Sequence, residues 1–167
     1  MIETSERIYQ LFLRAAESLQ SPFLLIVRLY WGWQFIQTGW GHLTHLDKVT
    51  AYFEQLGIPV PGLNAPFVSV LEFAGGILLV LGLASRPIAF LLSCNMIVAF
   101  VTGDREALTS VFSDPDKFYA AAPYTFLFAS LLILIFGPGQ FCLDNLVGTL
   151  VAKRPNSAKR KAQVLTA

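Results

Sequence analysis

Arg28 and Glu72 are the residues of this sequence whose chemistry most needs an explanation. From residue 18 to residue 46 the only charged side chain is Arg28, and from residue 55 to residue 85 it is Glu72. An ionised group at the centre of a membrane helix costs about 2.5–3.5 kcal/mol on insertion scales, so such a group faces the interior of a bundle. One acid and one base therefore predict a buried pair between two helices.

Both charges share a helical face with small residues. At 100° per residue, the positions that return to the face of Arg28 are Gly32, Phe35, Gly39 and His42. The positions on the face of Glu72 are Ser69, Gly76, Leu79 and Leu83. Small residues let membrane helices approach closely, because packing is their main attraction in lipid. We therefore expect both charged faces to be helix–helix contacts.

The depth of the two charges in the membrane argues against a direct bridge. Each lies about six residues from an end of its apolar segment, but from opposite ends, so their Cα atoms would be ~10–15 Å apart along the membrane normal. A third group would have to lie between them. The candidates are Trp33, Gln34, Gln37, Asn95 or a ligand.

The candidate intramembrane polar site therefore comprises Arg28, Gln34, His42, Glu72 and Asn95. Three interpretations stay open: a polar latch that fixes helix register, a pocket for a ligand such as a quinone, and a path for protons or a substrate. Beside His42 only His45 could add a metal ligand, so no metal site is predicted. No nucleophile–base arrangement and no flavin, nicotinamide, haem or cluster motif is found. No catalytic residue can be assigned.

Composition places these residues in a membrane protein. Hydrophobic residues make up 54% of the 167 residues and charged residues 14%, against about 25% charge in soluble domains. Four apolar segments are long enough to cross a bilayer, at about 22–42, 66–84, 87–103 and 119–137. We predict an all-α four-transmembrane-helix bundle, with Pro22, Pro66, Pro87 and Pro123 in or near the first turns. One membrane domain would cover 1–152, followed by a basic, disordered tail at 153–167.

Amphipathic patterns flank the four segments. Before the first segment, apolar residues recur at helical spacing at Ile8, Leu11, Phe12, Ala15 and Leu19. After the fourth segment they recur at Leu143, Leu146, Val147 and Leu150. These patterns predict N- and C-terminal amphipathic helices, the first lying flat on the inner membrane surface. The turn-rich stretch 57–64 is predicted to be non-helical.

Lys and Arg residues predict the orientation. Eight lie on the side of the termini and of the loop at Arg86, and three lie in the two longer loops. Because cytoplasmic flanks carry the excess of Lys and Arg, we expect a multi-pass protein of the cell inner membrane with both termini cytoplasmic. The dense C-terminal basic cluster is expected to be a topological anchor or a contact with anionic membrane lipids. Nucleic acid is not predicted as a partner. Whether the chain forms a homo-oligomer stays open.

Three strings of the sequence resemble the DoxX family of small membrane proteins. Residues 39–43 read GWGHL after Arg28, residues 72–86 read EFAGGILLVLGLASR, and residues 137–144 read GPGQFCLD. The resemblance runs from about residue 22 to residue 149. The sequence departs from the family pattern at His42, where a Lys is usual, and at Cys142, where a Ser is usual.

The resemblance implies a four-span bundle connected with redox work. Proteins similar to DoxD belong to a thiosulfate:quinone oxidoreductase, and DoxX proteins are associated with membrane oxidoreductase complexes. The leading hypothesis is therefore an accessory or quinone-interacting subunit of a redox system, with quinone as candidate cofactor and a membrane or periplasmic redox protein as partner. As an enzyme it would be at most a quinone-linked oxidoreductase subunit. The alternatives are a non-catalytic structural or assembly protein and, third, a small-solute transporter.

Overall fold

The computed structural model describes residues 2–144, and in these residues it contains helices and no strand. The helices in chain order are α1 (Ile2–Thr44), α2 (Leu46–Gln55), α3 (Pro61–Leu81), α4 (Ser85–Thr102), α5 (Arg105–Thr109), α6 (Pro115–Ala120) and α7 (Ala122–Phe136). Pro61 and Pro123 open α3 and α7, where a missing backbone N–H is least costly.

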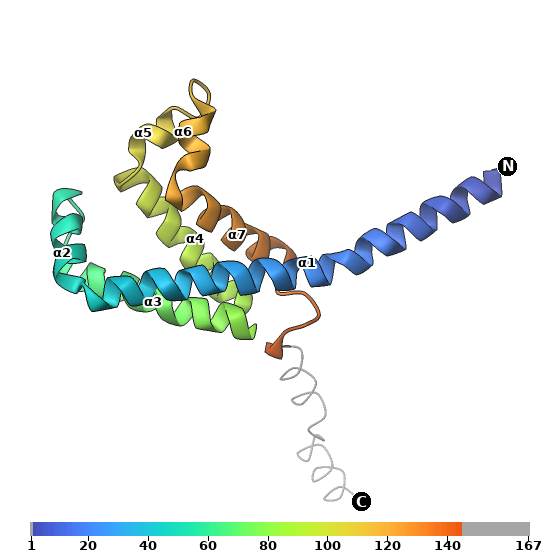
Figure 1. The fold of residues 1–167 in the computed structure, drawn as a ribbon, viewed down its shortest axis with the longest axis horizontal. Coiled ribbons are helices and arrows are strands. Elements are labelled where there is room, and N and C mark those ends of the chain that lie inside the picture. Colours follow the sequence, from blue (N-terminus) through green and yellow to red (C-terminus); the bar gives the residue numbers. More distant parts are fainter. Residues whose placement is uncertain (1, 145–167) are drawn as a thin grey trace, which may run out of the picture.

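The long helices form two pairs (Figure 1). Helix α1 lies along α3, and α4 lies along α7. Helices α3 and α4 form a hairpin whose turn contains Gly82 and Ala84, both at positive φ, and they diverge away from this turn. We call the end with the turn the hairpin end. The opposite end, where α2, α5 and α6 lie, is the loop end.

Glycines set the distance between α1 and α3. A Cβ built on Gly76 would lie 2.6 Å from the carbonyl oxygen of Gly32, and one built on Gly39 would overlap the backbone of Phe73. The two helices therefore touch backbone to backbone, as small residues allow in membrane proteins. Their antiparallel register places Gly32 beside Gly76 and Gly39 beside Phe73.

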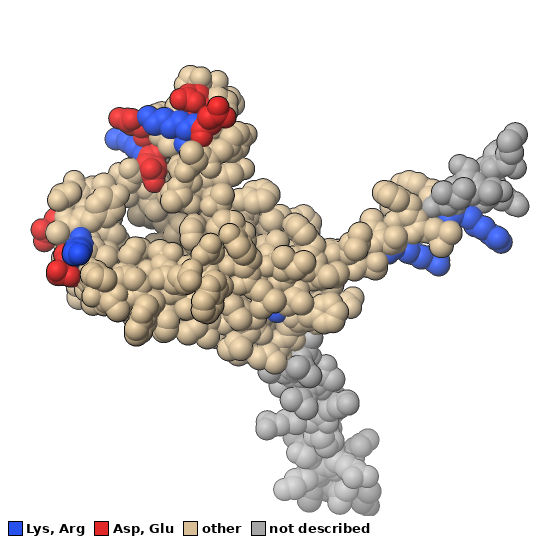
Figure 2. Space-filling model, in the orientation of Figure 1, with Lys and Arg blue, Asp and Glu red and all other residues tan. Residues whose placement is uncertain are grey.

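The apolar core lies between the two helix pairs. It contains the buried side chains Val27, Phe35, Leu79, Ala89, Leu92, Met96, Ala129 and Ile133. Many large apolar side chains remain exposed outside it. The view in Figure 2 shows a broad, almost entirely uncharged surface between charged groups at the loop end and on the first part of α1. Such a surface suits lipid rather than water. By length and apolarity, α3 and α4 could each cross a membrane, and α7 is a shorter apolar helix.

Some predicted boundaries were wrong. The first segment has no break before it, because α1 is one helix of 43 residues that runs through Pro22. The ring of proline holds φ at a helical value but removes one backbone hydrogen bond, at a cost of about 3 kcal/mol in a helix interior. Membrane helices tolerate this where neighbouring groups satisfy the freed carbonyl. Pro66 also lies inside a helix, since α3 begins at Pro61, and only 57–60 of the predicted turn is non-helical. Most of the predicted C-terminal helix and the basic tail lie outside the described residues.

Candidate functional site

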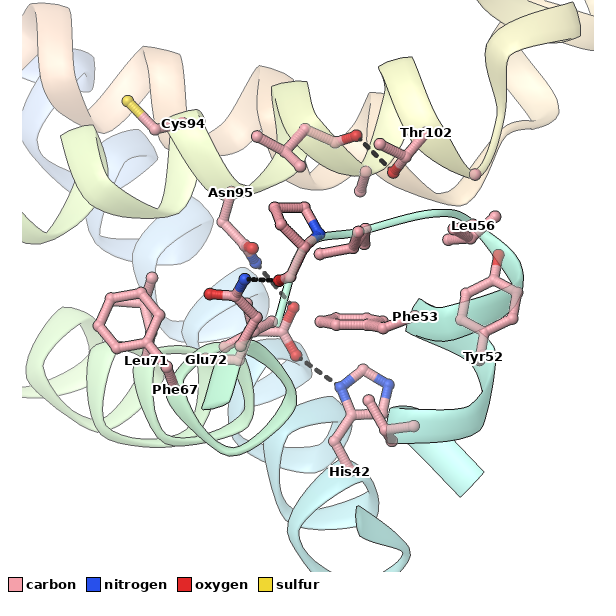
Figure 3. A pocket seen from close by; sticks show the side chains of 18 of the residues that line it. His42, Tyr52, Phe53, Leu56, Phe67, Leu71, Glu72, Cys94, Asn95 and Thr102 are labelled. Carbon is pink, nitrogen blue, oxygen red and sulfur yellow. Dashed lines mark hydrogen bonds and ion pairs between the residues drawn. The ribbon is translucent and has the colours of Figure 1, made fainter. Parts of the chain in front are cut away.

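The carboxylate of Glu72 is the centre of a polar cluster formed by three helices (Figure 3). Glu72, in α3, is 4% exposed. Its Oε1 accepts a hydrogen bond of 3.0 Å from Asn95 Nδ2 in α4, and its Oε2 lies 2.9 Å from Nδ1 of His42 at the end of α1. Three of the five predicted site residues are therefore brought together. We call them the Glu72 cluster.

The glycine contact between α1 and α3 explains why His42 reaches Glu72. Gly39 packs on the backbone of Phe73, the neighbour of Glu72. His42 follows three residues later, so its side chain lies on the same helical face, one turn farther along. A buried carboxylate is costly unless it is hydrogen-bonded or paired, and His42 and Asn95 supply those contacts. The cluster thus depends on the close approach of two backbones.

The Glu72 cluster lies on the wall of a cavity at the loop end. The cavity has a volume of about 670 Å³, within the range of about 300–1,000 Å³ that is usual for ligand sites. Its lining is mainly apolar and comes from α2, the 57–60 turn, α3 and α4; it includes Val49, Phe53, Leu56, Ile58, Phe67, Val68, Leu71, Leu91 and Val98. A ligand in this cavity would therefore have apolar surroundings, with hydrogen-bonding groups on one wall only.

His42 leaves one hydrogen-bonding atom available to a ligand. Its Nδ1 is held by Glu72, while the other ring nitrogen points away from Glu72 and forms no hydrogen bond with a described residue. The side chain is 38% exposed. An imidazole held in this way can donate to a ligand when charged or accept from one when neutral.

Arg28 belongs to a different structure at the hairpin end. Its side chain is 2% exposed and donates hydrogen bonds to the carbonyl oxygens of Pro138, at 2.7 Å, and Phe141, at 2.6 Å. Asp144 accepts hydrogen bonds from the backbone N–H groups of Ala84 and Ser85 at the start of α4. We call these contacts the Arg28 clamp. It holds segment 137–144 against α1 and the hairpin turn.

Arg28 and Glu72 therefore do not pair directly. Their opposite charges had suggested a pair, and their depths in the membrane had argued against a direct bridge. Because α1 and α3 are antiparallel, Arg28 lies beside Gly82, whereas Glu72 lies near His42. Arg28 and Glu72 are separated along the helix axes, as their positions in the sequence predicted, so no ion pair forms between them. Each side chain forms hydrogen bonds with other groups. The sequence could not indicate that the carbonyl groups of segment 137–144 accept hydrogen bonds from Arg28, because every residue type carries a backbone carbonyl.

Gln34 is not part of the Glu72 cluster. Its side-chain amide donates to the hydroxyl of Tyr30 at 3.3 Å, within α1. Helix α2, which was not among the predicted site elements, contributes Tyr52 and Phe53 to the lining of the cavity. Apolar residues recur along α2 at helical spacing, at Leu46, Val49, Tyr52, Phe53 and Leu56, and this pattern could have indicated a helix that packs on the bundle.

The described part of the chain contains no group of three or more His, Cys, Asp or Glu side chains that could hold a metal ion. Cys94 is exposed and lines the cavity, whereas Cys142 is buried. Outside the apolar helices, Lys117 donates to Glu106 at 2.7 Å. This contact lowers the pKa of Glu106 and raises the pKa of Lys117. Because both groups are exposed, the contact joins α5 to α6 only weakly.

Comparison with known proteins shows the family. The model of the DoxX family matches residues 23–105. The inner membrane protein YphA of Escherichia coli (strain K12) is 32% identical over 123 residues, which cover 73% of this chain and 88% of that protein. The chain belongs to the DoxX family. The inner membrane protein YqjF of the same strain is 29% identical over 132 residues, covering 78% of this chain and 96% of YqjF.

The DoxX match contains Arg28 and the whole Glu72 cluster but ends before α6. A third relative, an uncharacterized membrane protein of Mycobacterium tuberculosis (strain ATCC 25618 / H37Rv), is 29% identical over 131 residues, covering 74% of this chain and 80% of its own length. No solved structure matches significantly. Since the named relatives are membrane proteins, the uncharged surface in Figure 2 is that of a membrane protein of the DoxX family.

Proposed function

We propose that this DoxX protein binds a quinone and acts as an accessory, quinone-interacting subunit of a membrane redox system. The observation that carries the proposal is the apolar cavity with the Glu72 cluster on its wall. A quinone is an apolar ring with two carbonyl oxygens, which become hydroxyl groups on reduction. Asn95 and the free ring nitrogen of His42 can form hydrogen bonds with such oxygens. Electrons would be exchanged with a membrane or periplasmic redox protein.

The membrane arrangement is part of the proposal. Residues 22–42 of α1, with α3, α4 and α7, would cross the membrane as four spans of a single domain at 1–152. The hairpin end, both termini and the basic tail at 153–167 would face the cytoplasm. In support, Arg7 and Arg14 lie in the first part of α1 and Arg86 follows the hairpin turn, whereas the only Lys or Arg residues at the loop end, among the described residues, are Lys48, Arg105 and Lys117. The cavity would then lie on the periplasmic side.

Glu72→Gln is expected to weaken quinone binding about tenfold or more. The amide keeps the shape of the side chain but removes the charge that orients His42 and Asn95, and a hydrogen bond to a charged group contributes about 1.5–3 kcal/mol. Binding is measured by isothermal titration of a ubiquinone analogue into the protein in lipid nanodiscs. The control is Glu54→Gln, which changes an exposed carboxylate of α2 outside the cavity lining. Absence of quinone binding by wild type would refute the proposal, and equal binding by wild type and Glu72→Gln would show that the quinone does not bind at the Glu72 cluster.

A second candidate, an assembly protein without a ligand, rests on the tip between α5 and α6. Phe112 is 95% exposed there, beside the acidic residues Glu106, Asp114 and Asp116. An exposed aromatic side chain in a charged loop is suited to a protein partner. Crosslinking from position 112 in native membranes would identify that partner. Retention of the partner by Glu72→Gln, together with absence of quinone binding by wild type, would favour this candidate.

A further inference from the structure

The cavity is closed toward the loop end and open at its side. At the loop end α2 lies across it, and a Cβ built on Gly103 would lie 3.1 Å from the hydroxyl of Tyr52 and 3.9 Å from Leu56. The side chains of α2 therefore reach the end of α4. Apart from Glu72, the charged lining residues are Lys48 and Asp104, and both lie at this end. Between α2 and α4 the space-filling view shows the molecule hollowed from the side (Figure 2).

The side opening results from the divergence of α3 and α4. Near the hairpin turn the two helices are in contact, since a Cβ on Gly75 would lie 3.4 Å from Ile88 and from Leu92. Farther from the turn they are apart. Phe67 is 63% exposed and Val98 is 51% exposed, although both line the cavity.

The rim of this opening is apolar. Phe67 and Leu71 of α3 and Leu91 and Val98 of α4 line the cavity, and Phe67, Leu91 and Val98 are also exposed at the surface. In a membrane with its normal along the long helices, this rim would be in contact with acyl chains. A water-soluble ligand that approached from the loop end would have to pass α2, which covers the cavity there. A lipid-soluble ligand that approached from the membrane would meet only the apolar rim.

We infer that the ligand enters from the lipid between α3 and α4, and that its apolar tail stays in this opening while its polar head contacts the Glu72 cluster. This inference rests on the proposed function and specifies the substrate class as quinones with a long prenyl or alkyl tail. Lipid is as apolar as the opening, so the tail gains little affinity there. The opening provides a route and a place for the tail.

The test compares a long-tailed and a tail-less ubiquinone analogue at equal concentration within nanodisc lipid. Val98→Trp narrows the opening, and overpacking of about 1–3 kcal/mol corresponds to a five- to 150-fold loss. We expect this loss for the long-tailed analogue and less than about twofold for the tail-less one. The control is Ile97→Trp, which adds the same side chain at an exposed position of α4 outside the lining and should affect neither analogue.

The outcomes separate the two claims. If wild type binds neither analogue, the proposed function fails. In another outcome, wild type binds both analogues while Val98→Trp either weakens the binding of both equally or leaves both unchanged. In either case the side route is wrong and the proposed function stands. A second measurement uses unaltered protein and a quinone with a photoreactive group on its tail. Crosslinks at Phe67, Leu91 or Val98 support the inference. Crosslinks confined to α2, or crosslinks abolished by excess phospholipid but not by excess quinone, overturn it.

Discussion

Gly39→Val is expected to destabilise the bundle by about 3 kcal/mol or more, because the new side chain would overlap the backbone of Phe73. A flexible side chain could move aside, but a helix backbone cannot do so without moving all of α3. Separation of α1 from α3 would also withdraw His42 from Glu72, so quinone binding should be lost. Unfolding in mixed micelles with increasing SDS measures the stability, with tryptophan fluorescence as the signal, since all three tryptophans lie in α1.

Gly41→Val is the matched control for this prediction. Gly41 lies in the same turn of α1, and a Cβ there would meet nothing within 4 Å. The control therefore carries the same gain in side-chain volume and the same β-branched effect on the helix without the overlap. Stability of Gly39→Val within 1 kcal/mol of Gly41→Val would mean that the two backbones do not touch as described.

Arg28→Leu is expected to release segment 137–144 from the bundle. Two hydrogen bonds from a charged group contribute about 1.5–3 kcal/mol each, offset in part by the cost of burying the guanidinium. A net loss of about 3 kcal/mol would accelerate amide hydrogen exchange in this segment roughly 100-fold. The amide of Asp144, which bonds the carbonyl oxygen of Gly82, is the most informative reporter by mass spectrometry or NMR.

Arg14→Leu is the control, since Arg14 is exposed in the same helix and should leave exchange in 137–144 unchanged. The double variant Arg28→Leu with Glu72→Gln provides a further check. Because the Arg28 clamp and the Glu72 cluster share no described hydrogen bond, their effects on stability should add to within about 0.5 kcal/mol. If the effect of the double variant on stability differed from the sum of the single effects by several kcal/mol, Arg28 and Glu72 would interact directly, contrary to the structure.

The features that could be predicted from the sequence are those that depend on the geometry of a single helix. Most residues on the faces of Arg28 and Glu72 are buried, as the 100° rule predicted, and only His42 and Leu83 of the named positions are partly exposed. The glycines on those faces are the points where α1 and α3 meet. Asn95, offered as a group between Arg28 and Glu72, forms a hydrogen bond with Glu72, while Arg28 has other partners. These results follow from helix geometry, which is the same in every helix and needs no knowledge of the neighbours.

The site as a whole needed the arrangement of helices in space. His42 was assigned to the face of Arg28, yet its partner is Glu72, because the antiparallel register of α1 and α3 sets which end of one helix meets which end of the other. The cavity depends on the divergence of α3 and α4 and on the position of α2, neither of which has a local sequence signal. Segment 137–144 resembled the family, but only the fold placed its carbonyl groups beside Arg28.

The amino-acid sequence alone therefore determined the membrane class, the family and the faces on which polar residues are buried. Hydropathy and helical periodicity are local properties, and lipid imposes them on each segment separately. Only the tertiary structure decided which buried groups are partners, since a hydrogen bond of about 3 Å depends on the axial register of two helices. A shift of one helical turn, about 5.4 Å, would break every contact of the Glu72 cluster without changing the hydropathy of any segment.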